Sequence, residues 1–504
     1  MAQDVTLCWR SLRERWADSV SGTLVRVMRS VWARRAVVVV AVLALSAVSL
    51  RWDAIPQFDP QGWLLWGREV TSATLSFSTL NYPSWKPLPA LITMPLGLTG
   101  EAAVPLWLVL VRASSLLAVG LAYRLGRRLG GRAAGALAAG ALLCVPEWLR
   151  FTIQGFSEPL LVALLLLSLE RLLAGHPREA LAAAVLAGLD RPEAWPLAAL
   201  LAWVVWRTPS RARGSLRLVA LGAVLALLPL AWLGGDWLGS GDPFHAGRLA
   251  RHAANALETR QPGPIAHTLD LTRALIGLPV ALGALAAVGV GLRRRESEVL
   301  IVAAAALGWL AAELALVAAG FPTDARFLLP VAALGCVLAA SGAARLPALT
   351  SHRALAATLA VGLAAASTPW AVGAASGLVR QARSTLPYAR AVSTLDHLVH
   401  SLRPDAILAC GQPGITHTFQ TRLAWDLHTN TREVRFRHPP GLLFVRAPPS
   451  ARQLVRYIGW RADPELERVA QQGKWSVYIF ASTVRRSRPR RASAPSGAHC
   501  HFPS

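Results

Sequence analysis

Charged and aromatic side chains alternate in one short segment near the amino end of the chain. Its charged residues are Asp53, Asp59, Arg68, Glu69 and Lys86. Its aromatic residues are Trp52, Phe58, Trp63, Trp66, Tyr82 and Trp85. A carboxylate of such a set can take a proton from a hydroxyl group, and a cation can hold a phosphate or a developing negative charge. The segment therefore has the residue types for group transfer, provided that neighbouring elements bring these side chains together.

The neighbouring elements are long apolar runs. Of the 504 residues, 54% are hydrophobic and only 16% are charged, which is too little charge to cover the surface of a soluble protein. Many of the runs approach the roughly 20 residues that cross a hydrocarbon core of about 30 Å. The sequence therefore predicts an integral membrane protein. Because charged groups at or inside a membrane are costly, those beside the runs are functional candidates.

The runs predict about eleven spanning helices. They cover residues 36–50, 105–125, 133–149, 159–173, 180–189, 194–206, 218–233, 275–292, 299–319, 327–340 and 354–375. A shorter piece at 88–98 is either the lower half of the second helix or a re-entrant segment. Arginine-rich short loops occur at 124–132, 207–217, 293–295 and 345–353. If residues 180–206 form two helices, all four loops lie on the cytoplasmic side with the basic amino end.

These patterns predict the order of domains along the chain. Residues 1–35 form a basic cytoplasmic segment, and residues 36–379 form the transmembrane domain, whose first outer loop is 52–87. Residues 380–484 are predicted to form a small extracytoplasmic α/β domain, and residues 485–504 a disordered tail rich in Arg, Pro and Ser. The strand-like runs of the small domain are 406–409, 442–445 and 477–480.

The net charge is +24, a balance that can indicate a nucleic-acid partner. Much of the excess lies in the short loops between apolar runs, so we assign it to membrane orientation and expect no nucleic acid. His245 and His252 lack a clear set of metal-ligand partners, and no CxxC pair occurs. We therefore predict no metal site and no cofactor, and leave open a divalent cation held by carboxylates.

The stretch from Phe58 to Val70 predicts a short helix. Asp59 is expected to cap it, with Pro60 at the first helical position. Its apolar face, which includes Trp63 and Trp66, is expected to lie along the membrane surface. The spacing alone leaves open whether Asp59 only caps the helix or also acts in a site.

Several short motifs with charged residues occur along the chain. They are Asp59, Gly67-Arg68-Glu69-Val70, Lys86-Pro87-Leu88-Pro89, Gln154-Gly155-Phe156-Ser157-Glu158-Pro159-Leu160 and Asp324-Ala325-Arg326-Phe327-Leu328-Leu329-Pro330. Over about residues 36–345 this arrangement resembles the polytopic GT-C glycosyltransferases, specifically the protein O-mannosyltransferase and aminoarabinose transferase relatives. The chain departs from them by having Pro60 in place of a second acid and by permuting a Lys-Pro-Pro-Leu element.

The resemblance implies an α-helical GT-C-like membrane fold and a glycosyltransferase that uses a polyprenyl-phosphate sugar. Transfer would take place at the outer face of a bacterial cytoplasmic membrane, to a hydroxyl of a glycan, lipid or protein acceptor, with membrane lipids as further partners. Asp59 is then the expected general base, with Asp53 second. Lys86 is the first candidate for holding the donor phosphate, and Arg326 the next.

Glu158, Arg68 and Glu69 are expected to position the acceptor. Simpler roles stay open, because Lys86 could extend to the interface, Arg326 could anchor its helix end, and Glu158 could merely favour a helix start. Asp190, Arg191 and Glu193 could pair with one another where the run 180–206 is interrupted. A direct role of these three residues in the site is the alternative to such pairing.

Two other classes of function remain. A transporter or flippase of a lipid-linked or charged solute would place polar residues near the membrane midplane, whereas here they gather at helix ends, and no internal repeat is evident. A non-catalytic membrane protein could keep the GT-C-like fold and bind a partner through residues 380–484.

Overall fold

The computed structural model describes residues 31–52, 54–72, 77–80, 83, 85–209, 214–258, 263–345, 353–435, 441–446 and 466–480. The chain divides into two units, one ending at Trp52 and the other beginning at Asp53. The described part of the first unit is helix α2 (Val31–Val48) with the short 3-10 turn η1 (Ser49–Arg51). The predicted disordered tail lies outside the described residues.

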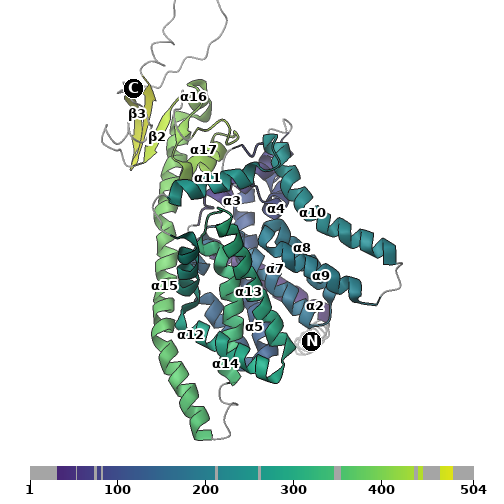
Figure 1. The fold of residues 1–504 in the computed structure, drawn as a ribbon. Helices are drawn as coiled ribbons and strands as arrows, with labels where there is room; N and C mark the ends of the chain where they lie inside the picture. Colours follow the sequence, from purple (N-terminus) through teal and green to yellow (C-terminus); the bar gives the residue numbers. More distant parts are fainter. Residues whose placement is uncertain are drawn as a thin grey trace, which may run out of the picture. The chain divides into compact units, whose positions relative to one another are not determined.

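The second unit is built mainly from helices (Figure 1). In chain order they are α3 (Phe58–Thr71), α4 (Pro87–Gly97), α5 (Ala103–Leu143), α6 (Trp148–Ile153), α7 (Glu158–Leu173), α8 (Pro177–Asp190), α9 (Trp195–Arg207), α10 (Gly214–Ser240), α11 (His245–Glu258), α12 (Pro264–Arg294), α13 (Ser297–Ala318), α14 (Leu329–Arg345), α15 (Arg353–Leu402), α16 (Pro404–Ala409) and α17 (Gln420–Asp426). Short 3-10 turns are η2 (Gly100–Ala102), η3 (Pro192–Ala194), η4 (Ala325–Leu328) and η6 (His417–Phe419).

Among the described residues, five helices are long and apolar enough to cross a membrane. They are Gly100–Leu143, Leu218–Ser240, Pro264–Arg294, Ser297–Ala318 and Ala325–Arg345. Ala36–Arg51 and Pro87–Gly97 are shorter apolar helices. The multi-pass helical architecture is as predicted, and the count of about eleven spans stays a prediction.

Residues 180–206 form two helices, as favoured by the charge pattern. Asp190 ends α8, and the turn η3 separates it from α9. The predicted run 105–125 lies in the first arm of α5, and most of the run 133–149 lies in its second arm, which ends at Leu143; the helix folds back at Gly130 and Gly131. Gly131 has a φ of +85°, a conformation that glycine adopts without strain.

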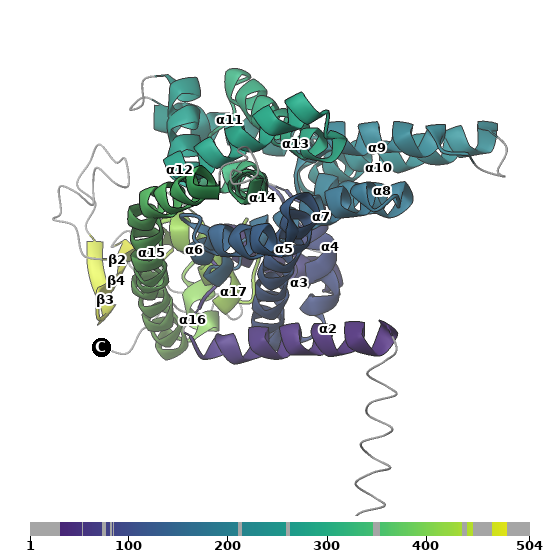
Figure 2. The ribbon, with the colours of Figure 1, turned by 90° about the horizontal axis from the view of Figure 1, so that it is seen from below.

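The core of the bundle forms around α14. This helix packs against α5, α7, α12 and α13, and Figure 2 shows it end-on among them. Gly342 of α14 lies so close to Gly283 of α12 that a Cβ at Gly342 would overlap the Gly283 carbonyl. Small residues therefore let these two backbones approach directly, as is usual where helices meet inside a membrane.

Helix α3 differs from the prediction, because its apolar face is covered by protein. Trp63 and Trp66 are almost fully buried. Trp63 packs edge-on against Trp107 of α5 at 5.9 Å between ring centroids, and Trp66 lies 5.5 Å from Trp85. An amphipathic pattern cannot distinguish a lipid surface from a protein surface as the partner of an apolar face.

Close contact between α3 and α4 requires glycine. A Cβ at Gly67 would overlap the backbone carbonyl of Thr93, and one at Gly97 would lie 2.7 Å from the Gly67 oxygen. The Thr93 hydroxyl donates to the carbonyl of Trp63 at 2.7 Å, which fixes the crossing. Helix α4 follows Lys86 directly, so this crossing sets the position of Lys86 relative to α3.

We expect Gly67→Ala to destabilise the protein by about 1–3 kcal/mol, because the added methyl group must push two backbones apart. The thermal unfolding midpoint in detergent should fall, and Gly140→Ala is the matched control. Gly140 is also helical, but a Cβ there meets nothing within 4 Å. Equal midpoints for Gly67→Ala and wild type would contradict this account of the crossing.

A single long helix passes through the predicted boundary of the carboxy-terminal region, which stays a prediction. Helix α15 runs without interruption from Arg353 to Leu402, through the predicted junction at 379/380, and reaches the small sheet (Figure 1). Residues 406–409 are helical rather than extended, since Pro404 occupies the first turn of α16 and Asp405 favours a helix amino terminus.

A small sheet follows these helices. Its strands are β1 (Gly414–Ile415), β2 (Leu443–Arg446), β3 (Leu466–Gln472) and β4 (Trp475–Phe480). Their spatial order is β1-β2-β4-β3, with β1 parallel to β2 and the other pairs antiparallel. The predicted strands at 442–445 and 477–480 are thus confirmed as β2 and β4, and the predicted mixture of helix and sheet is observed.

Candidate active site

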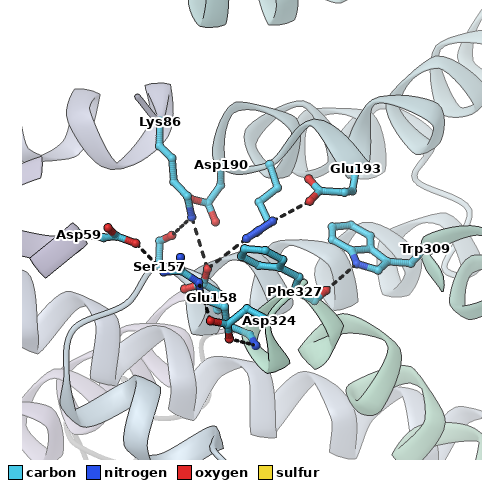
Figure 3. Close-up of polar contacts among 11 residues, drawn as sticks. Asp59, Lys86, Ser157, Glu158, Asp190, Glu193, Trp309, Asp324 and Phe327 are labelled. Atoms are coloured by element: carbon cyan, nitrogen blue, oxygen red, sulfur yellow. Dashed lines mark hydrogen bonds and ion pairs between the residues drawn. The ribbon is translucent and has the colours of Figure 1, made fainter. Parts of the chain in front are cut away.

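Charged side chains from five separate parts of the chain meet in one network (Figure 3). Asp59 comes from the first turn of α3, and Lys86 directly precedes α4. Glu158 begins α7, Arg191 follows the last residue of α8, and Arg326 lies in η4. Helix ends can bring charged side chains together, because they hold the side chains firmly while leaving them outside the apolar run.

Lys86 is turned into the protein. Its Nζ atom lies 3.1 Å from Ser157 Oγ, 3.4 Å from Glu158 Oε1 and 4.0 Å from Asp190 Oδ1. Its side chain is 12% exposed and lies 5.0 Å from the centre of the Trp63 ring. Lys86 therefore does not extend to a surrounding interface, and its charge is shared among buried acceptors.

Glu158 is fully buried and joins two cations. Its Oε1 atom lies near Lys86 and is 3.6 Å from the guanidinium of Arg191. Arg191 also binds Glu193 Oε1 at 2.6 Å and stacks over the ring of Phe327 at 3.8 Å. The predicted pairing of Arg191 with Glu193 is therefore present, and it extends further than predicted because Arg191 also faces Glu158.

Arg326 connects the network to Asp59. Its Nη1 atom lies 2.5 Å from Asp59 Oδ2. The carboxylate of Asp324 caps η4 by accepting from the backbone N–H of Arg326 at 3.0 Å. On the other side, Trp309 of α13 donates to the carbonyl of Phe327 at 3.0 Å, so η4 is held from two directions.

The predicted capping role of Asp59 is wrong. Gln57 occupies the N-cap position of α3 without a side-chain cap bond, and Asp59 lies inside the first turn. A carboxylate there is still favourable to the helix dipole. Its side chain is directed to Arg326. Because 21% of that side chain is exposed, the carboxylate is accessible to a bound molecule.

The other predicted site residues have different surroundings. Arg68 donates to the carbonyls of Ala424, Trp425 and Thr429 in the carboxy-terminal region. Glu69 is buried and accepts a hydrogen bond from the backbone N–H of Ser78 at 3.1 Å. The structure thus brings Asp59, Lys86, Glu158 and Arg326 into the network and gives Arg68 and Glu69 other partners. Asp53 lies outside the described residues.

Burial raises the pKa of Glu69 from 4.5 to about 8, against the opposing effects of the Ser78 hydrogen bond and of Arg68. In the folded protein, Glu69 then stays protonated over a pH range in which the same side chain is ionised in the unfolded chain. Stability should therefore fall as pH rises from about 4.5 to about 8, by about 5 kcal/mol at most.

We expect Glu69→Gln to remove this part of the pH dependence, since glutamine does not titrate. Thermal unfolding midpoints of both proteins in detergent, measured from pH 5 to pH 9, test it. If the two curves ran parallel over that range, Glu69 would not be the group responsible.

The sequence did not indicate how far the network extends. Glu313 lies in the apolar run 299–319, is buried in α13, and interacts with Arg191 and Glu193. A single carboxylate within a predicted span is itself a functional signal, and it could have been used to find this side of the network. Ser157, beside Glu158, carried no such signal because serine occurs in most loops.

No family model matches the sequence, and no curated protein matches it either. Among solved structures, the chain is similar to ArnT from Cupriavidus metallidurans bound to undecaprenyl phosphate, with a TM-score of 0.57 and 15% identity over 89% of this chain and 98% of that chain. The apo state of the same ArnT gives a TM-score of 0.55 and 16% identity over 90% and 99% of the two chains.

ArnT is an aminoarabinose transferase with the GT-C fold, and the likeness covers nearly the full length of both chains. The predicted resemblance and fold class are thereby confirmed. The chain is a multi-pass membrane protein with the fold of the GT-C glycosyltransferases.

Proposed function

We propose that the protein is a membrane glycosyltransferase that moves a sugar from a polyprenyl-phosphate donor to an acceptor hydroxyl. The observation that carries the proposal is the charged network, in which Lys86, Arg191 and Arg326 lie among carboxylates that include Asp59. The fold supports the donor class, because the similar ArnT structure contains undecaprenyl phosphate.

The leaving group defines what the cations do. As the bond between the anomeric carbon and the phosphate oxygen breaks, the electron pair and negative charge move to the polyprenyl phosphate. Lys86 and Arg326 are the cations that we assign to that charge, since fixed positive groups in a site of low polarity stabilise it strongly. Glu158 and Asp190 hold Lys86 in place through its Nζ atom.

Asp59 is the proposed general base. It takes the proton of the acceptor hydroxyl while the acceptor oxygen attacks the anomeric carbon. Asp59 Oδ2 lies 2.5 Å from Arg326 Nη1. A donor phosphate that binds Arg326 competes for this guanidinium and frees the carboxylate oxygen, so deprotonation of the acceptor is coupled to the presence of the donor.

Glu158 is proposed to position a substrate hydroxyl. Its Oε1 atom faces the two cations, and among the described residues its buried Oε2 atom has no hydrogen-bond partner. A buried acceptor left without a donor is costly, so a substrate hydroxyl that donates to it would bind favourably. The same geometry makes Glu158 the next candidate for the base.

The network is proposed to face the outside of a bacterial cytoplasmic membrane. Glu158 begins α7, whereas Glu170 near the other end of α7 pairs with Arg124 beside the arginine-rich turn of α5. Arginine-rich turns remain in the cytoplasm, so the opposite end of α7 faces outward. The disulfide bond of Cys410 also fits an oxidising compartment for the carboxy-terminal region.

The test is transfer by the purified protein from a polyprenyl-phosphate sugar labelled in the sugar, with a nucleotide sugar as the control donor. Glycan, lipid and peptide acceptors are supplied in turn. We expect labelled product and released polyprenyl phosphate with the lipid donor alone. Tight binding of the donor without cleavage, with every acceptor class, would favour a non-catalytic protein, and movement of uncleaved donor across vesicles would favour a transporter.

A further inference from the structure

Helix α3, which carries Asp59, is held by a segment more than 350 residues later in the chain. This segment comprises η6, α17 and the residues up to Thr429, and we call it the α17 clamp. It contacts α3 at its beginning, its middle and its end.

The beginning of α3 is held through Phe58, the neighbour of Asp59. The ring of His417 packs on the ring of Phe58 with 4.1 Å between centroids and 36° between planes. The hydroxyl of Thr421 donates to the Phe58 carbonyl at 3.0 Å, and this contact is buried. Burial lowers the pKa of His417, against the effect of nearby Asp59, so its ring packs as a neutral imidazole at pH 7.

The middle of α3 passes near the clamp at Gly62, although the neighbour that requires glycine there is Pro83. A Cβ at this position would lie 3.4 Å from the Thr421 methyl group and would overlap the ring of Pro83 on another side. Glycine inside a helix is unfavourable by about 1 kcal/mol relative to alanine, so its presence here has a packing reason.

The end of α3 is held through Arg68. Its guanidinium donates to the carbonyls of Trp425 at 3.0 Å, Ala424 at 3.2 Å and Thr429 at 3.0 Å, and it lies 4.5 Å from the centre of the Trp425 ring. The last carbonyls of a helix lack partners within that helix and form its negative end. Arg68 of α3 therefore caps the carboxyl end of α17.

The clamp is itself fixed to a long helix. Arg422 of α17 binds Asp396 of α15 at 2.8 Å, and it also binds Asp426 within the clamp at 2.9 Å. The indole N–H of Trp425 donates to Glu101 at 3.2 Å. Because the clamp is anchored on two sides, it can resist displacement of α3.

We propose that the α17 clamp sets the position of Asp59 for transfer, with His417 as a positioning residue that acts through its ring packing on Phe58. This proposal rests on the proposed function for its catalytic consequence. A displacement of a reacting group by about 1 Å can lower the rate about 100-fold. Rigid support of α3 therefore has a direct effect on the rate of transfer. The carboxy-terminal region would then support the site by holding α3 in place.

The experiment compares His417→Ala, His417→Phe and the matched control His400→Ala, whose side chain is exposed on α15. We expect His417→Ala to lower kcat about 10- to 100-fold with little change in the KM for the donor. His417→Phe keeps an aromatic ring on Phe58 and should restore most of kcat, with the pH profile of the wild type. A phenylalanine variant as inactive as the alanine variant would overturn the proposal, because it would assign the effect to the imidazole nitrogens.

Hydrogen exchange tests the clamp without any assay of transfer. Peptides that cover α3 should exchange faster in His417→Ala and in Arg68→Ala than in wild type or His400→Ala. Unchanged exchange in both variants would overturn the clamp, whatever the protein transfers. Faster exchange in a protein that transfers no sugar would instead reject the proposed function and keep the structural support of α3.

Discussion

Replacing Asp59 with asparagine is expected to lower the rate of sugar transfer about 10²- to 10⁴-fold, the usual contribution of a general base. Asparagine has nearly the same size, so the first turn of α3 should keep its shape. The substitution also removes the carboxylate that engages Arg326 at 2.5 Å. Donor affinity should therefore be kept or increase, because the guanidinium no longer has to leave Asp59 before it binds the phosphate.

Single-turnover transfer and equilibrium binding of the donor separate these two effects. The matched control is Asp270→Asn, since Asp270 is 72% exposed on α12 and its pairing with Arg273 is long, at 3.9 Å. Equal rates for wild type and Asp59→Asn would remove Asp59 as the base and direct attention to Asp53 or Glu158. A rate that fell only in proportion to donor binding would instead make Asp59 a binding residue.

Four of the residues in the network were predicted as site residues from sequence motifs. Asp59, Lys86, Glu158 and Arg326 stand beside helix starts and prolines, where the local signal is strong. Such motifs indicate which charges lie at helix ends, and the shared fold explains why those ends meet. The motifs do not indicate which charged side chains pair with one another. The contact between Asp59 and Arg326, which are 267 residues apart, is known only from the structure.

Arg68 illustrates what local patterns cannot provide. Its position beside Glu69 in a family-like motif suggested an acceptor role, whereas its guanidinium caps a helix 356 residues away. The same limit explains why the apolar face of α3 was assigned to the membrane surface. Hydrophobic periodicity identifies the face that must be covered, and only tertiary structure identifies what covers it.

Replacing Lys86 with methionine is expected both to destabilise the protein and to weaken donor binding. Glu158 and Asp190 have fully buried side chains and share the Lys86 charge. Removing one partner of a buried ion pair commonly costs about 3–5 kcal/mol, because the remaining charge stays uncompensated. Methionine retains the length and apolar body of lysine, so the loss reports on the charge rather than on a cavity.

A double variant separates the structural role of Lys86 from its proposed role at the phosphate. In Lys86→Met with Asp190→Asn, the buried negative charge is reduced along with the positive one, so the unfolding midpoint should recover in part. Binding of polyprenyl phosphate should stay weak, because the cation assigned to the phosphate is still absent. Lys474→Met is the matched control, since Lys474 is the other lysine of the chain and is exposed in the turn between β3 and β4. Recovery of lipid-phosphate binding in the double variant would show that Lys86 acts only by balancing buried carboxylates, and the donor phosphate would then be assigned to Arg326 and Arg191.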